Sequence, residues 1–151
     1  MTELPGAIHA EVLRLCGEGD EFAQRNQFDQ ALTCFRQAWD LLPEPRYQWE
    51  AAEWLLATIG DFEFQRGDFA AGRMALMDVV KFVDTAKGNP FIRLRLGQCL
   101  YETGEETEAA NWLGPAFATE GLALFGAEDP KYIQFVKSKL QPPPGGWPKG
   151  W

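Results

Sequence analysis

The sequence has few of the residues that catalytic and metal sites use. It contains one histidine, His9, and one serine, Ser138, and it has no Gly-x-Ser-x-Gly nucleophile motif. His9 has no metal-ligand spacing to any cysteine. The acidic segments GEGDE and ETGEETE match neither a phosphate-binding loop, which needs a lysine, nor a calcium loop. We therefore expect no catalytic residues, no metal site and no cofactor, and we expect that the chain is not an enzyme.

Cysteines and long apolar runs are also scarce. Cys16, Cys34 and Cys99 are odd in number, lie far apart and include no Cys-x-x-Cys pair, which favours buried free thiols in a reducing cytoplasm. No stretch approaches the roughly 18 apolar residues that a membrane helix needs. The N-terminus shows no basic segment followed by an apolar run, so we expect no signal peptide and a cytoplasmic location.

Basic residues are outnumbered by acidic ones. The chain has 14 Lys and Arg against 22 Asp and Glu, which gives a formal net charge of −8. A surface of that sign repels the phosphates of nucleic acids and anionic membranes. It either attracts a basic protein partner or simply keeps the chain soluble. The 151 residues, 46% of them hydrophobic, suffice for one domain with a substantial core.

What the sequence does contain is one spacing of small and large residues that occurs three times. The three registers begin at Gly19, Gly60 and Gly97, and the same four offsets from these glycines (7, 12, 16 and 19 residues) hold similar residues. They are Asn26, Ala31, Phe35 and Ala38 in the first, Gly67, Gly72, Leu76 and Val79 in the second, and Gly104, Ala109, Leu113 and Ala116 in the third.

This spacing predicts a pair of helices in each register. The first glycine lets a second helix approach closely, and the Gly or Asn seven residues later ends the first helix in a left-handed turn. The last three positions share one face of the second helix, where the large residue fills the gap that the small residues leave. The chain is therefore expected to be all-α.

Local signals place the ends of these helices. In KGNPF, Asn89 can cap a helix whose first turn contains Pro90, and Asp129 with Pro130 repeats that start. Pro115 lies inside the last repeat helix, so a kink or break is expected near Gly114–Pro115. The predicted segments are repeats over about 12–43, 46–84 (with a helix from about Pro45 to Arg66) and 90–121, and a closing helix over about 129–139.

The three registers resemble the tetratricopeptide repeat (TPR) family, whose unit is about 34 residues long. The first register is the best match, whereas the second has Gly72 and Val79 where the family usually has alanine. The resemblance implies a right-handed superhelical stack of three helix pairs with a C-terminal capping helix. This would form a single domain over 1–140, followed by an extended Pro/Gly/Trp tail over 141–151.

The resemblance also implies where a partner binds, because the first helices of such a stack line a concave face. Trp54, Phe64 and Phe91 either anchor a partner there or pack against a neighbouring helix or the tail. In the tail, Trp147 and Trp151 either dock on the body or a partner, or belong to a mobile end. The predicted partner-binding residues of the concave face are Asp20, Gln24, Trp54, Asp61, Phe64, Gln65, Phe91, Arg95, Gln98, Tyr101 and Glu102.

The segments EPRYQWEAAEWLLATIGDFEFQRGDF, GNPFIRLRLGQCLYETGEETEAANWL and EDPKYIQFVKSKLQPP look like a group of small bacterial TPR proteins. Members of that group are often encoded beside polymorphic, Rhs-type or contact-dependent toxins. The resemblance implies an immunity protein that binds and neutralises a basic toxin domain in the cytoplasm. The alternatives are a TPR-class type III secretion chaperone that binds a translocator segment, and a scaffold or regulatory module. The partner is a protein in each case, and the oligomeric state is open.

Overall fold

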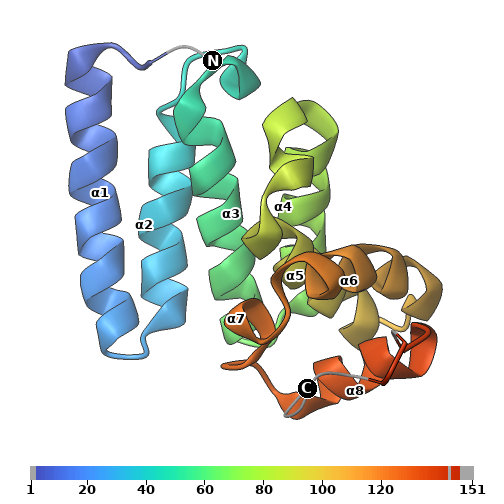
Figure 1. The fold of residues 1–151 in the computed structure, drawn as a ribbon. Coiled ribbons are helices and arrows are strands. Elements are labelled where there is room, and N and C mark those ends of the chain that lie inside the picture. The colour runs from blue at the N-terminus through green and yellow to red at the C-terminus, as the bar shows by residue number, and fades with distance from the viewer. Residues whose placement is uncertain (1–2, 143, 147–151) are drawn as a thin grey trace. The chain divides into compact units, whose positions relative to one another are not determined.

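The computed structural model describes residues 3–142 and 144–146, and helices with their connections account for this part of the chain, which contains no strand (Figure 1). The predicted all-α class is confirmed. The chain divides into two compact units, Met1–Lys87 (unit 1) and Gly88–Trp151 (unit 2). The single domain over residues 1–140 stays a prediction.

Unit 1 consists of two helix hairpins whose helices lie side by side in chain order (Figure 1). Within each hairpin the two helices pack along each other, and α2 also packs against α3. The elements are α1 (Gly6–Gln24), α2 (Phe28–Asp40), the 3-10 helix η1 (Arg46–Gln48), α3 (Glu50–Gln65), α4 (Phe69–Phe82) and the 3-10 helix η2 (Asp84–Gly88), which ends on the first residue of unit 2.

Unit 2 consists of the third hairpin and two further helices. The hairpin is α5 (Pro90–Glu102) with α6 (Glu106–Glu120), and α6 also contacts the one-turn helix α7 (Leu122–Phe125) and the closing helix α8 (Pro130–Lys139). The predicted closing helix thus agrees with α8, whereas α7 has no counterpart among the predicted elements.

The recurring glycines lie where the two helices of each hairpin touch. A methyl carbon added to any of them would lie closer to the facing side chain than real Cβ atoms approach a neighbour. The separations from such a Cβ are 2.8 Å to Phe35 Cε2 at Gly19, 2.6 Å to Leu76 Cγ at Gly60, and 2.5 Å to Leu113 Cγ at Gly97. The large residue sixteen positions later is thus the one that packs on the glycine, as predicted.

The residue seven positions after each glycine ends the first helix of its hairpin. Asn26, Gly67 and Gly104 have φ angles of 59°, 87° and 86°, which lie in the left-handed region. The predicted helix starts are also confirmed. The Asn89 side chain accepts hydrogen bonds from the backbone N–H groups of the first turn of α5, and the Asp129 side chain accepts one from the first turn of α8.

Two details of the prediction are wrong. α3 begins at Glu50 rather than at Pro45, because Trp49 is extended and its indole N–H donates to the backbone carbonyl of Pro43 at 2.8 Å. α6 continues through Pro115 as one helix, so the break is absent, whereas the alternative of a kink there stays a prediction. Pro115 and Asn111 are both exposed, so water can reach the Asn111 carbonyl that loses its partner in the helix.

The cores of the two units contain the residues that the repeat pattern placed inside. The small or medium residues nineteen positions after the glycines, Ala38, Val79 and Ala116, are 0–1% exposed. Cys16, Cys34 and Cys99 are buried free thiols, as expected. Within the part of the chain that the structure describes, no helix is both long enough and apolar enough to cross a membrane.

Candidate partner-binding surface

The predicted partner-binding stripe of α1 is exposed. His9, Leu13, Asp20 and Gln24 are spaced by four, seven and four residues, so they share one side of the helix. All four are exposed, and the Leu13 side chain, at 51% exposure, has no apolar cover over half of its surface. Asp20 and Gln24 therefore lie on an accessible helix face, and their contact with a partner stays a prediction.

A second stripe, partly exposed, runs along α3. Trp54, Asp61 and Gln65 are spaced by seven and four residues; Trp54 is 37% exposed, Gln65 is exposed and Asp61 is half-buried. The Gln65 amide donates to the Asp61 carboxylate at 3.4 Å, so these two side chains are paired along the helix. Contact of these three residues with a partner stays a prediction.

The two stripes meet at a pocket. At the N-terminal ends of α1 and α3 they border a pocket of about 290 Å³ that the segment before α1 helps to enclose. Figure 1 shows this segment running from the start of α1 toward the start of α3. We call the combined surface the α1/α3 face. It comprises His9, Leu13, Asp20, Gln24, Trp54, Asp61 and Gln65, together with the pocket lining of Glu3, Leu4, Gly6, His9, Glu50, Ala51 and Trp54.

Phe64 behaves differently from Trp54. Its ring is half-buried and lies edge-on to the ring of Phe69 in α4, with centroids 5.5 Å apart. Of the two alternatives that the sequence left open for Phe64, packing against a neighbouring helix is therefore realised. Trp54 is the aromatic residue of this stripe that offers an open ring surface.

In unit 2, the predicted stripe of α5 is not open at Arg95 and Gln98. Their exposures are 6% and 0%, contrary to our expectation. The Arg95 guanidinium donates to the Gln98 side-chain oxygen at 2.7 Å and forms an ion pair with Glu128, while the Gln98 amide donates to Glu128 at 2.8 Å. Phe91 packs beneath the same guanidinium, 5.2 Å from its ring centroid, so it too lies against its own helix.

The remaining predicted residues of unit 2 contact α8. The Tyr132 hydroxyl donates to the Glu102 carboxylate at 2.8 Å, and Lys131 forms an ion pair with the same group. The Tyr101 ring lies 4.8 Å from the Phe135 ring and 5.7 Å from the Tyr132 ring. Burial, with the Glu102 hydrogen bond, raises the pKa of Tyr132 above its usual range. The chain's own closing helix thus covers the stripe that we expected a partner to contact.

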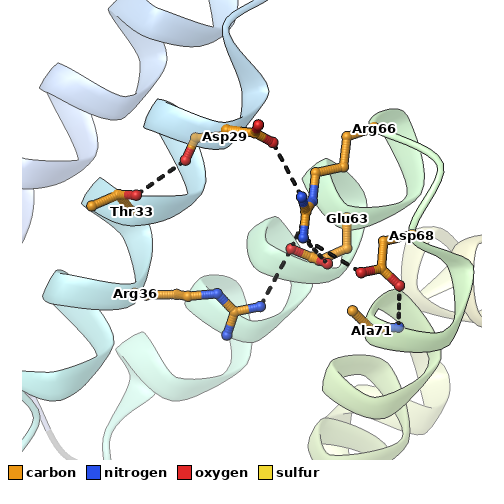
Figure 2. Close-up of polar contacts among 7 residues, drawn as sticks. All are labelled: Asp29, Thr33, Arg36, Glu63, Arg66, Asp68 and Ala71. Atoms are coloured by element: carbon orange, nitrogen blue, oxygen red, sulfur yellow. Dashed lines mark hydrogen bonds and ion pairs between the residues drawn. The ribbon is translucent and has the colours of Figure 1, made fainter.

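One polar cluster was not predicted at all. Figure 2 shows Glu63 of α3 between two arginines, with Arg36 Nη2 at 3.4 Å and Arg66 Nε at 3.2 Å from its Oε1. Arg66 also bonds Asp29 of α2 at 3.1 Å and Asp68, which caps α4. The Glu63 hydrogen bond is the main cause that raises the pKa of Arg66.

The Glu63 cluster joins α2, α3 and the α3–α4 turn. Glu63 is 0% exposed, and its carboxylate oxygens are bonded within the chain, so we assign the cluster to structure rather than to partner binding. A signal for it was present in the sequence. Glu63 continues the buried stripe of Ala52, Leu56 and Ile59 at helical spacing, and a carboxylate on such a stripe requires partners.

Two further expectations concern the C-terminal tail and metal binding. Trp147 and Trp151 lie outside the described residues. Over the described residues, no group of three or more His, Cys, Asp or Glu is placed to hold a metal ion.

Comparison with known proteins yields a likeness to a solved structure. No protein-family model matches the chain, and no curated protein matches it. Among solved structures, the chain is similar to the second TPR domain of the human RPAP3 protein, determined by NMR in complex with the HSP70 peptide SGPTIEEVD. The likeness has a TM-score of 0.63 at 12% sequence identity and covers 89% of this chain and 99% of that one. The helix hairpins of this chain are therefore TPR-like in fold.

Proposed function

We propose that this chain is a protein-binding module that takes a basic partner on the α1/α3 face. The observation that carries the proposal is the pairing, on one accessible surface, of exposed apolar side chains with carboxylates. Leu13 and Trp54 are each more than a third exposed, and Asp20 and Asp61 lie on the same two stripes. Aromatic anchors bordered by polar groups are typical of protein interfaces.

The charge of this face indicates the class of partner. Its two stripes and pocket contain four carboxylates, at Glu3, Asp20, Glu50 and Asp61, and no lysine or arginine. The TPR domain of RPAP3 is in complex with a peptide that has three acidic residues and no basic one. A peptide of that composition would be repelled here, so we propose the same kind of scaffold with a partner of opposite charge.

Within this role we propose that the chain is an immunity protein that neutralises a basic toxin domain. The resemblance to small bacterial TPR proteins encoded beside toxins supports this, and so does the net charge of −8. Carboxylates of the α1/α3 face would meet the basic groups with which such a toxin holds its substrate, and Trp54 would anchor the complex. Binding there would deny the toxin its substrate without any chemistry by this chain.

The test is affinity capture of partners from the cells that encode the protein, read by mass spectrometry. The full chain would be compared with Asp20→Lys/Asp61→Lys, which reverses the charge of the face. The matched control is Asp40→Lys/Glu120→Lys, where lysine falls at the C-terminal ends of α2 and α6 and suits the helix dipole. One stoichiometric polypeptide that the face variant loses and the control keeps would support the proposal; its retention by the face variant would overturn it.

Co-expression then tests the finer role. If the captured polypeptide arrests growth by itself and this chain restores growth, the immunity role stands. A captured polypeptide that is harmless, or that is a secretion translocator, rejects the immunity role and leaves the protein-binding role in place.

A further inference from the structure

We infer that the pocket between the N-terminal ends of α1 and α3 binds one lysine or arginine side chain of the partner, with the cation on the Trp54 indole between the Glu3 and Glu50 carboxylates. The inference rests on the proposed function and names the contact through which the α1/α3 face would recognise a basic protein. It adds a specific subsite that includes residues outside the predicted stripe, Glu3 and Glu50.

The size and lining of the pocket suit a single side chain. Pockets that hold drug-sized molecules run from about 300 to 1,000 Å³, and this one, at about 290 Å³, lies just below that range. Leu4 and Ala51 are buried and supply apolar lining, whereas Glu3 and Glu50 are exposed. An apolar interior with charged groups at its mouth matches a side chain that has an aliphatic stem and a charged head.

The carboxylates of the pocket have no cation of their own. Within the described residues, neither Glu3 nor Glu50 takes part in an ion pair. Elsewhere in unit 1, by contrast, Glu11 and Glu18 both pair with Arg14, and Glu63 pairs with Arg36 and Arg66. A partner's lysine or arginine would supply the missing charge.

The positive ends of the two helices offset the negative charge of Glu3 and Glu50 only in part. The N-terminus of a helix carries roughly +0.5 of an elementary charge, so the ends of α1 and α3 together contribute about +1. The Glu3 and Glu50 carboxylates contribute two full negative charges. The local balance is therefore negative, which favours a cation over a carboxylate or phosphate.

Trp54 adds selectivity for a cation over a neutral polar group. The indole is the aromatic ring that attracts cations most strongly. Its ring is 37% exposed and forms part of the pocket lining. Because Trp54 lies on the same stripe as Asp61, a partner seated in the pocket can continue along the α1/α3 face.

The test uses the full-length ¹⁵N-labelled chain and three capped tripeptides, Gly-Arg-Gly, Gly-Lys-Gly and Gly-citrulline-Gly. Citrulline keeps the shape of arginine and removes its charge. The readout is the indole N–H signal of Trp54, assigned with Trp54→Phe. We expect the arginine or lysine peptide to shift this signal to saturation. We expect Glu3→Gln/Glu50→Gln to weaken that binding about fivefold, since it removes two exposed ion pairs, each of which contributes modestly.

The matched control is Asp40→Asn/Glu120→Gln, which removes one exposed and one half-buried charge outside the pocket and should leave the affinity unchanged. Equal binding of the citrulline peptide would overturn the inference. Wild-type affinity in the Glu3→Gln/Glu50→Gln variant, or a response confined to other tryptophans, would do the same.

Failure of this inference can be told apart from failure of the proposed function. If a captured partner binds Glu3→Gln/Glu50→Gln and Trp54→Phe as tightly as the wild type, the pocket is not the contact and the protein-binding role stands. If no partner is captured but the basic tripeptides bind as expected, the subsite stands and the wider proposal falls.

Discussion

Units 1 and 2 contain the same kind of helix hairpin, but they differ in whether the outer stripe of its first helix is exposed. In unit 1, the outward stripes of α1 and α3 are exposed and border a pocket. In unit 2, the corresponding stripe of α5 is covered, because Tyr132 and Phe135 of α8 contact Tyr101, and Glu128 reaches Arg95. A TPR-like register therefore places a stripe on a helix, but it does not determine whether that stripe is free to bind.

The two units also reverse the roles of acid and base in their polar clusters. In unit 1 the buried member is Glu63, whose side chain is 1% exposed, and the side chains of its partners Arg36 and Arg66 are 54% and 37% exposed. In unit 2 the buried member is Arg95, whose side chain is 8% exposed, and the side chain of its partner Glu128 is 16% exposed. Removing the acid should therefore destabilise the two clusters by different amounts, because the loss of stability depends on how exposed the remaining arginine charge is.

The largest effect is expected from Glu128→Ala. This change leaves the buried Arg95 guanidinium without its carboxylate, and removing one partner of a buried pair costs about 3 kcal/mol or more. We expect faster amide hydrogen exchange in α5 and α8 with little change in α1 and α2, measured by mass spectrometry. Glu108→Ala, at an exposed position of α6, is the control. Uniform loss of protection in both units would contradict the comparison.

A smaller effect is expected from Glu63→Gln. The arginines that it leaves are partly exposed and can be solvated, and the amide can still accept one hydrogen bond, so the free energy of unfolding should fall by about 1–2 kcal/mol. Urea unfolding of the variant measures this. The neighbouring Asp29→Asn, at a carboxylate that is 78% exposed, should change stability by less than about 0.5 kcal/mol. A loss as large as that from Glu128→Ala would remove the distinction between the two clusters.

The smallest effect concerns alkaline pH and unit 1. Burial raises the pKa of the Cys16 thiol from 9.0 to about 11 in the folded chain, with a further contribution from Asp20. The unfolded thiol therefore loses its proton first, and stability falls as the pH rises between these two values, with no contribution below pH 9. We expect the melting temperature of wild type to drop more between pH 8 and 10 than that of Cys16→Ala.

Equal drops in the two proteins would show that Cys16 does not control this pH dependence. Burial also raises the pKa of Tyr132 in unit 2, so this residue too lowers stability as the pH rises. Tyr132 is present in both proteins, so its effect cancels when their melting-temperature drops are compared.

The parts of the fold that could be predicted are those that depend on neighbours along the chain. The contacts of Gly19, Gly60 and Gly97 with the residue sixteen positions later follow from one hairpin geometry repeated three times. The caps at Asn89 and Asp129 act on N–H groups two or three residues away. The spacing of residues along a helix and the choice of turn and cap residues encode these glycine contacts and caps, because each involves residues that are close in the chain.

The candidate site was predictable only as stripes. Asp20, Gln24, Trp54, Asp61 and Gln65 lie on accessible helix faces, as their spacing indicated. The pocket was missed because Glu3 lies before α1, outside any helix period. Glu50, by contrast, lies four residues before Trp54 on α3, and this helical spacing was a signal for a contact edge. The cover over α5 was missed because Glu128 and Tyr132 approach it from 33 and 30 residues away.

The sequence by itself determined that this chain forms TPR-like helix hairpins with an acidic surface. Glycine spacing and turn residues determine the hairpins because they act between residues close in the chain, and net charge is a sum that needs no structure. Only the tertiary structure decided which hairpin keeps an open face. That choice depends on where the segments before α1 and after α6 run, and on which distant side chains they bring to Trp54 and Arg95. Such long-range contacts have no periodic signal in the sequence, because they depend on how whole helices pack together rather than on the spacing of residues within a single helix.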